Sequence, residues 1–132
     1  MQQAGVFGGV FYTDPTTSKP TWSAYYPAST NASDLKASIY MDPTIVFEAQ
    51  HDETGTAALN FASGNFVGTG GSTITGQSTQ ELDTDTFGTT ASGLKQVGIS
   101  VDPDNSDTGS ANCNAYAVFN QEEHVFTFAT GI

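Results

Sequence analysis

Residues 102–107 form the segment best suited to binding a metal ion. They read Asp-Pro-Asp-Asn-Ser-Asp, and hard cations such as calcium bind clusters of carboxylate and amide oxygens supplied by one turn. An EF-hand loop also has a glycine at its sixth position and a bidentate glutamate at its twelfth, and this stretch has neither. We therefore expect a solvated turn, with a weak calcium site as the alternative.

His51 and His124 are the two histidines and the natural candidates for a general base or a zinc ligand. A carboxylate from Asp52 or Glu53 could orient the imidazole of His51 for proton transfer. Zinc sites usually place a second His or Cys three to five residues away, and neither histidine has such a neighbour. The pattern favours polar strand ends, so an enzyme would need one histidine to meet carboxylates from elsewhere in the fold.

Motifs for nucleophilic catalysis and phosphate binding are missing from the sequence. There is no Gly-x-Ser-x-Gly elbow. Cys113 lies between two asparagines without a Cys-His pattern, so it is expected to pack as a small apolar residue. Residues 68–71 are glycine-rich but lack the lysine of a phosphate-binding loop. The sequence therefore predicts a protein that is not an enzyme and has no catalytic residues, no cofactor and no metal site.

Three aromatic residues, Trp22, Tyr25 and Tyr26, fall within five positions. Aromatic rings fill cores and interfaces, and they also bind sugars by stacking. On a strand, Trp22 and Tyr26 would share one face while Tyr25 points to the other. Packing in a core or interface is favoured, and a carbohydrate-binding β-sandwich module is the alternative function.

The composition excludes several partners. The 132 residues correspond to 13.8 kDa, which fits one domain spanning residues 1–132. Fourteen Asp and Glu face three Lys and no Arg, so the net charge is −11. Nucleic acids and anionic membranes bind through Lys and Arg clusters that this chain does not have. We expect neither as a partner.

Short apolar runs of period two, interrupted by Gly, Pro, Asn and Asp, predict an all-β fold. Strands are expected at residues 5–12, 21–26, 35–40, 45–50, 94–101, 115–119 and 125–128. A bulge or bend is expected at Gly8 and Gly9. The third and fourth strands are expected to form a hairpin through the turn at residues 41–44. The pattern predicts a single small β-barrel or β-sandwich of short antiparallel strands.

Residues 52–93 are dominated by Gly, Ser and Thr, with isolated apolar residues between them. A flexible linker seldom carries apolar residues at such regular intervals. We expect an ordered, loop-rich excursion with short strands, part of which becomes ordered on assembly.

The sequence also bears on cellular location. No apolar run approaches the roughly 18 residues of a membrane span. Residues 1–5 lack the basic start of a signal peptide, which predicts either synthesis and use in a cytoplasm or removal of a leader. A single cysteine favours an intracellular protein.

Several segments carry a resemblance to a known family. Residues 5–12 read Gly-Val-Phe-Gly-Gly-Val-Phe-Tyr and lead into a Thr-rich turn and an aromatic-Tyr-Pro strand end at residues 22–27. Residues 42–50 read Asp-Pro-x-x-x-Phe-x-x-Gln. Further segments match in kind and order at residues 33–37, 70–78, 97–99 and 120–124. Together they resemble small structural proteins of tailed-bacteriophage virions, usually described as head decoration or capsid-associated proteins.

The resemblance implies a structural protein that decorates or cements a capsid shell, assembled in the host cytoplasm and located in the virion. Its partners would be the major capsid protein and copies of itself, as a trimer or another symmetric cluster. Large aromatic residues in polar surroundings are then expected to be buried between chains. The candidates are Phe61, Phe66, Phe87, Phe126 and Phe128.

Overall fold

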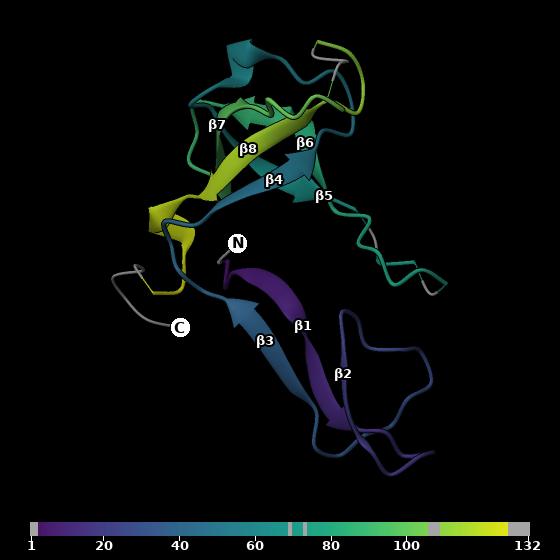
Figure 1. Cartoon of the computed structure of the whole chain (residues 1–132). Coiled ribbons are helices and arrows are strands. Elements are labelled where there is room, and N and C mark those ends of the chain that lie inside the picture. The colour runs from purple at the N-terminus through teal and green to yellow at the C-terminus, as the bar shows by residue number, and fades with distance from the viewer. Residues whose placement is uncertain (1–2, 69, 73, 106–108, 127–132) are drawn as a thin grey trace.

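The structure is a computed structural model that describes residues 3–68, 70–72, 74–105 and 109–126. Within these ranges there are eight strands and no α-helix, which confirms the all-β prediction (Figure 1). The strands are β1 (Val6–Thr13), β2 (Pro20–Ser23), β3 (Lys36–Tyr40), β4 (Val46–Gln50), β5 (Ser63–Val67), β6 (Glu81–Gly88), β7 (Leu94–Ile99) and β8 (Asn114–Phe119). Two short 3-10 helices, η1 (Ala57–Leu59) and η2 (Gln121–Glu123), complete the elements.

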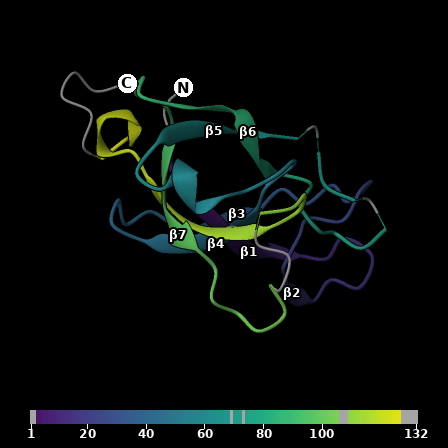
Figure 2. The ribbon, with the colours of Figure 1, turned by 90° about the horizontal axis from the view of Figure 1, so that it is seen from above.

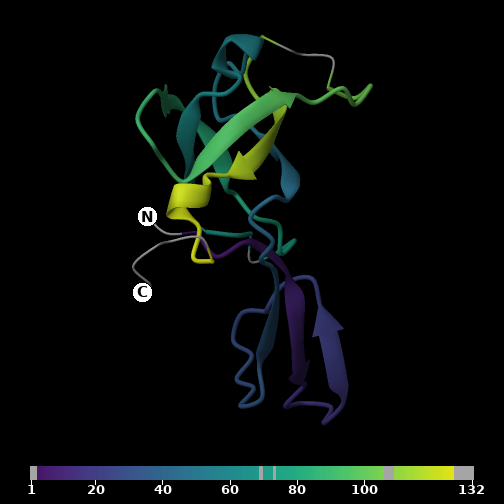
Figure 3. The same ribbon diagram turned by 90° about the vertical axis from the view of Figure 1, so that its left-hand side faces the viewer.

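A three-stranded antiparallel sheet of order β2-β1-β3 forms the first part of the fold. We call residues 6–40 the arm, because this sheet projects from the rest of the molecule (Figure 3). The pairing of β1 with β3 shifts register between Phe7 and Gly9, which confirms the expected bulge. Gly9 has a φ of +119°, a backbone conformation that is strained for residues with a Cβ. The bulge therefore explains why glycine stands there.

A five-stranded antiparallel sheet of order β4-β8-β7-β5-β6 forms the second part, which we call the head (residues 45–126). The sheet curls, so that β6 at one edge comes close to β4 at the other edge (Figure 2). His51, just after β4, forms a single bridge with Leu82 of β6. The two sheets form a small sandwich-like fold and not a closed barrel.

The hydrophobic core lies inside the curled sheet of the head. Its fully buried members are Leu82, Leu94, Ala115 and Ala117. Alternate residues of β8 are buried, as expected for a strand with one face toward a core. Phe47 packs against this core, and its ring centroid lies 4.9 Å from that of Phe119.

The predicted hairpin between residues 35–40 and 45–50 is wrong. β3 pairs with β1 of the arm, whereas β4 pairs with β8 of the head. The turn between them carries the chain from one sheet to the other, with Asp42 Oδ1 accepting the Thr44 N–H at 2.8 Å. Apolar and polar residues alternate over 35–40, which predicts one inward-facing side, but this too is wrong because all five residues of β3 are exposed. A turn motif specifies a change of direction but not which strands pair.

The structure also shows where three other predicted segments begin, end or lie. The second strand ends at Ser23 and not at residue 26. The loop-rich stretch 52–93 supplies β5 and β6, including the core residue Leu82. Of the strand expected at residues 125–128, Val125 and Phe126 lie in a turn, and the remainder lies outside the described residues.

Candidate functional site

Three exposed aromatic rings share one face of the arm. Phe11 pairs with Trp22 across β1 and β2, and their ring centroids are 6.5 Å apart. Phe11 also pairs with Lys36, and Tyr40 lies four residues after Lys36 on the same face of β3. Phe11, Trp22 and Tyr40 are each more than half exposed, at 55%, 53% and 59%. We call these three residues the aromatic platform.

The glycines of the bulge form the floor of the aromatic platform. A Cβ on Gly9 would lie 2.9 Å from Cζ2 of Trp22, and a Cβ on Gly8 would lie 2.7 Å from Cε2 of Tyr40. The two rings therefore occupy the space that side chains at the bulge would fill. The bulge that bends the arm also makes room for the platform.

The opposite face of the arm is covered by the chain itself. Val10 and Tyr12 are buried there. Tyr26 packs edge-to-face on Tyr12, with ring centroids 5.5 Å apart. The Tyr26 hydroxyl donates to the carbonyl of Thr30 at 2.7 Å and accepts the Ala32 N–H at 3.1 Å. Tyr26 therefore anchors the loop that covers this face.

The three aromatics singled out in the sequence are consequently separated. Trp22 is exposed on the platform, and Tyr26 is part of the internal packing of the arm. The ring of Tyr25 lies against Gly76 of the head, where a Cβ would come within 2.1 Å of it. The expectation that Trp22 and Tyr26 share a strand face is wrong because β2 ends before Tyr26.

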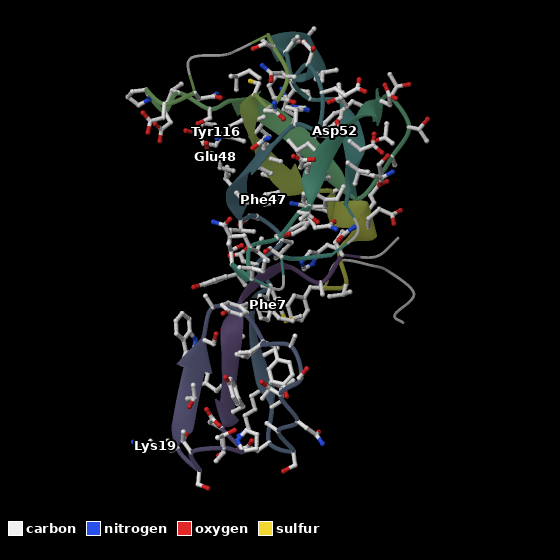
Figure 4. All side chains as sticks on the ribbon, turned by 90° about the vertical axis from the view of Figure 1, so that its right-hand side faces the viewer. Phe7, Lys19, Phe47, Glu48, Asp52 and Tyr116 are labelled. Carbon is white, nitrogen blue, oxygen red and sulfur yellow. The ribbon has the colours of Figure 1, made fainter. Side chains whose placement is uncertain are left out.

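Charge is divided unevenly between the two parts of the chain. In the arm, Asp14 and Asp34 balance Lys19 and Lys36, so the arm is neutral. The net charge of −11 therefore falls on the rest of the chain, where twelve Asp and Glu face Lys95 alone. Figure 4 places Lys19 at the far end of the arm and Glu48 and Asp52 on the head. The aromatic platform thus lies on the electrically neutral part of the chain.

A cavity of about 680 Å³ lies where the arm meets the head. Phe7 and Tyr25 line it from the arm, and Phe47, Phe66 and Phe119 line it from the head. Figure 4 shows Phe7 at the base of the arm, toward the head. The lining is mainly apolar, so this junction could take up an apolar group but offers little acid–base chemistry.

The predicted interface residues fall into three groups. Phe66 stacks on Phe47 at 5.9 Å, and Phe87 lies 5.5 Å from the ring of His51, so both rings pack within the head. Phe61 and Phe126 are exposed, at 73% and 66%. Phe128 lies outside the described residues. Only Phe61 and Phe126 therefore present most of their ring to solvent among the described candidates.

His51 is fully buried and held by a polar network. The Gln96 amide nitrogen donates to the carbonyl of Thr56 at 3.1 Å and to Asn60 Oδ1 at 2.8 Å. Gln96 Oε1 therefore faces His51 Nε2, 2.9 Å away, and accepts its N–H. His51 Nδ1 is then the acceptor for the Thr84 hydroxyl at 3.1 Å. The network satisfies both nitrogens of a neutral imidazole.

Burial lowers the pKa of His51 below its ordinary value, although the hydrogen bond to Gln96 and the charge of Asp52 oppose the shift. The Asp52 carboxylate accepts the backbone N–H of Thr84 at 3.0 Å. Asp52 therefore holds β6 in place through this hydrogen bond. His51 connects β4, β6 and β7 inside the head. This arrangement stabilises the fold and gives a substrate no access to the imidazole.

The acidic loop is tied to the beginning of β8 by Asn105. Asn105 Nδ2 donates to the carbonyls of Ser100 at 2.9 Å and Asn114 at 3.0 Å, and its Oδ1 accepts the Asn114 N–H at 2.9 Å. Asp102 Oδ1 accepts the Asp104 N–H at 2.9 Å. Residues 106–108 lie outside the described ones. Cys113 is fully buried, as expected for a small apolar residue.

His124 is distant from His51 in the sequence. It packs between two aromatic rings. Its ring centroid is 5.7 Å from that of Phe119 and 5.8 Å from that of Phe126. Its Nδ1 accepts the Phe126 N–H at 3.2 Å. Within the described residues, no three His, Cys, Asp or Glu side chains are grouped as ligands for a metal ion.

Sequence reasoning named Trp22 but missed Phe11 and Tyr40. Alternation along β1 and β3 was the available signal, because it separates Phe11 from Tyr12 and Tyr40 from Ile39. Which residues meet across strands depends on register, and the Gly8–Gly9 bulge changes that register. The platform therefore becomes visible only when the three strands are aligned.

Comparison with known proteins yields no match among family models, curated proteins or solved structures. In the part of the chain that the structure describes, no helix is long and apolar enough to cross a membrane. The surface of the arm and the resemblance of the sequence segments are the features that bear on function.

Proposed function

We propose that this chain is a structural protein of a tailed-bacteriophage virion, which decorates or cements the capsid shell by binding its major subunits through the arm. The observation that carries the proposal is the concentration of exposed aromatic surface on the neutral part of a highly acidic chain. Burial of an aromatic platform against a protein partner is favourable, and aromatic residues are enriched at such interfaces.

The charge distribution supports the same orientation. Acidic sites on a protein shell would repel an acidic surface. They would not repel the neutral arm. The acidic head would then face outward, where its charge disfavours adhesion to nucleic acid and to anionic cell surfaces. The segments that resemble the virion family, residues 5–12 and 42–50, contribute to β1 and to the connection from β3 into β4.

The test is binding of the purified protein to expanded, undecorated capsids of the source phage. We expect saturable uptake at a fixed stoichiometry and a higher temperature of capsid rupture. Trp22→Ala and Tyr40→Ala should each lower the affinity at least tenfold, as expected for central aromatic anchors, which contribute about 2 kcal/mol or more. Ile74→Ala, at an exposed apolar residue of the head, is the matched control and should bind as the wild type does.

Two outcomes contradict the proposal. Capsids that take up none of the well-folded wild-type protein would exclude the shell-binding role. Equal binding by the platform variants, together with loss of binding in Phe61→Ala, would move the interface from the arm to the head.

Carbohydrate binding is the second candidate, and the exposure of Trp22 favours it. Stacking of a sugar on the indole would change the fluorescence of the single tryptophan. We would titrate a panel of glycans and follow Trp22 emission, and repeat the titration of any active glycan by calorimetry with Trp22→Ala as the control. A saturable change with any glycan supports this function, and its absence across the panel excludes it for the glycans used.

A further inference from the structure

The outer edge of β3 is open. β3 lies at the edge of the arm sheet, with β1 on its inner side. In the described ranges, no other strand pairs with its outer side, and all five of its residues are exposed. Unpaired backbone N–H and C=O groups along such an edge form a template for another strand.

Alternation identifies the backbone groups that point outward. The N–H of Thr13 donates to Asp34 Oδ1 at 2.9 Å, on the β3 side of β1. Alternation along β1 therefore turns the backbone of Phe11 toward β3, where it pairs with Lys36. The next residues of β3 then alternate, so the N–H and C=O groups of Ala37 and Ile39 face outward.

The two edges of the arm differ in their protection. β2 has only four residues and begins with Pro20, which lacks an N–H, and both features discourage pairing. β3 has no proline, and its one charged residue, Lys36, is at its first position. Ile39 and Tyr40 are exposed large apolar residues on this edge. The unprotected edge is therefore β3.

The sequence of β3 is complementary to itself. An antiparallel copy aligned on Ser38 places Ala37 opposite Ile39 of the second copy, so the outward backbone groups meet as hydrogen-bonded pairs. Lys36 then lies opposite Tyr40 of the second copy, which suits a cation–π contact. The same face carries the aromatic platform, so pairing would join two platforms into one surface.

The charge distribution also favours this alignment. The head follows the Tyr40 end of β3, and the arm extends away from it (Figure 3). Antiparallel pairing therefore places the two acidic heads at opposite ends of the joined sheet, while the neutral arms meet at its centre. The joined arms therefore separate the two negatively charged heads, and this distance weakens the repulsion between them.

We propose that β3 pairs antiparallel with β3 of a second copy of this chain, about a two-fold axis at Ser38, to give a continuous six-stranded sheet. The pairing uses the edge of the arm, whereas the proposed shell contact uses its aromatic face. Each therefore stands or fails separately.

Ala37→Pro tests the pairing, because it removes an outward N–H that the arm itself does not use. Proline is tolerated on an edge strand at such a position. Ala37→Val is the matched control, since it adds similar bulk and keeps the N–H. Mass would be measured by sedimentation over a range of concentrations, and folding by circular dichroism and Trp22 emission. We expect dimers for the wild type and Ala37→Val, and at least a tenfold weaker dimer for Ala37→Pro.

A cross-linking experiment tests the register even if the proline variant fails to fold. Ser38 would face Ser38 of the second copy in a non-hydrogen-bonded pair, with Cα atoms about 4.5 Å apart, which suits a disulfide. Ser38→Cys should form a disulfide-linked dimer on mild oxidation, while the native Cys113 is buried. Lys36→Cys is the control, because its two copies would lie roughly 13 Å apart along the strands.

The proposal is overturned if the wild type is a monomer at all concentrations, if it forms a trimer, or if Ser38→Cys and Lys36→Cys cross-link equally. A monomer that still binds capsids would remove the pairing alone. A dimer that does not bind capsids would remove the proposed function alone.

Discussion

Gly9 lies directly beneath the indole of Trp22, so that a Cβ on Gly9 would be 2.9 Å from Cζ2 of the ring and 2.9 Å from the carbonyl oxygen of Ser23. The same residue has a φ of +119°. The bulge of β1 and the position of the exposed ring therefore depend on each other. Any side chain at Gly9 would have to move the indole or the backbone of β2.

Gly9→Ala is expected to destabilise the protein by about 2 kcal/mol, because the backbone is strained for alanine and the ring must shift. Trp22 emission should change in the folded state. Thermal or urea unfolding measures the first effect and fluorescence the second. Gly88→Ala is the control, since a Cβ there meets no atom within 4 Å. Equal stability of both variants would show that the Gly9 bulge is not required.

Gln96→Leu is expected to destabilise the protein by about 3 kcal/mol, because buried partners lose their hydrogen bonds. The partners are His51 Nε2, the Thr56 carbonyl and Asn60 Oδ1. Urea unfolding measures the change. Gln77→Leu, at an exposed position, should stay within about 0.5 kcal/mol of the wild type. A loss below 1 kcal/mol in Gln96→Leu would mean that the network contributes little.

Stability should fall as the pH drops through the ordinary His pKa of 6.5, because burial lowers the pKa of His51 in the folded state. The unfolded chain then binds the proton more readily, so acid favours unfolding until the folded pKa is also passed. The contribution of neutral His51 to stability is fully present above pH 6.5. Urea unfolding at several pH values would measure it.

Two variants assign this pH dependence. His51→Gln removes the titrating group and should flatten the stability curve over that window, at some cost in stability. His124→Gln leaves His51 in place and should keep the slope. A slope that persists in His51→Gln but disappears in His124→Gln would contradict the assignment.

Calcium should leave the unfolding midpoint unchanged, because the amide of Asn105 is used within the fold and Asp102 Oδ1 accepts a backbone N–H. Differential scanning calorimetry with about 1 mM calcium, near the affinity of weak extracellular sites, and with a chelator would measure this. A saturable rise in the midpoint that Asp104→Asn abolishes would instead establish the weak calcium site considered from the sequence.

Strand positions were largely predictable from residue patterns. The alternation of residues 94–101 and 115–119 predicts β7 and β8, because one face of each packs on the core. The bulge at Gly8 and Gly9 was also predictable, since glycine accepts a backbone that other residues do not. These features depend on neighbours in the chain.

Pairing and the candidate site were less predictable. The turn after Tyr40 favoured a hairpin, but β1 and β8 compete for β3 and β4 and decide the sheets. Trp22 was identified as a possible binding residue, whereas its neighbours on the platform come from other strands. The burial of His51 could not be read from its polar surroundings in sequence, because Gln96 and Thr84 reach it only in the folded head.

The sequence by itself determined the all-β class, the acidic charge and the positions of most strands, because hydrophobic alternation, composition and glycine backbone freedom are local properties. Only the tertiary structure decided that a neutral arm projects from an acidic head and that Phe11, Trp22 and Tyr40 share a face. It also decided that no strand of the described residues pairs with the outer edge of β3. These depend on register and on pairing between distant segments, which are set by the free energy of packing the whole chain and not by any one segment.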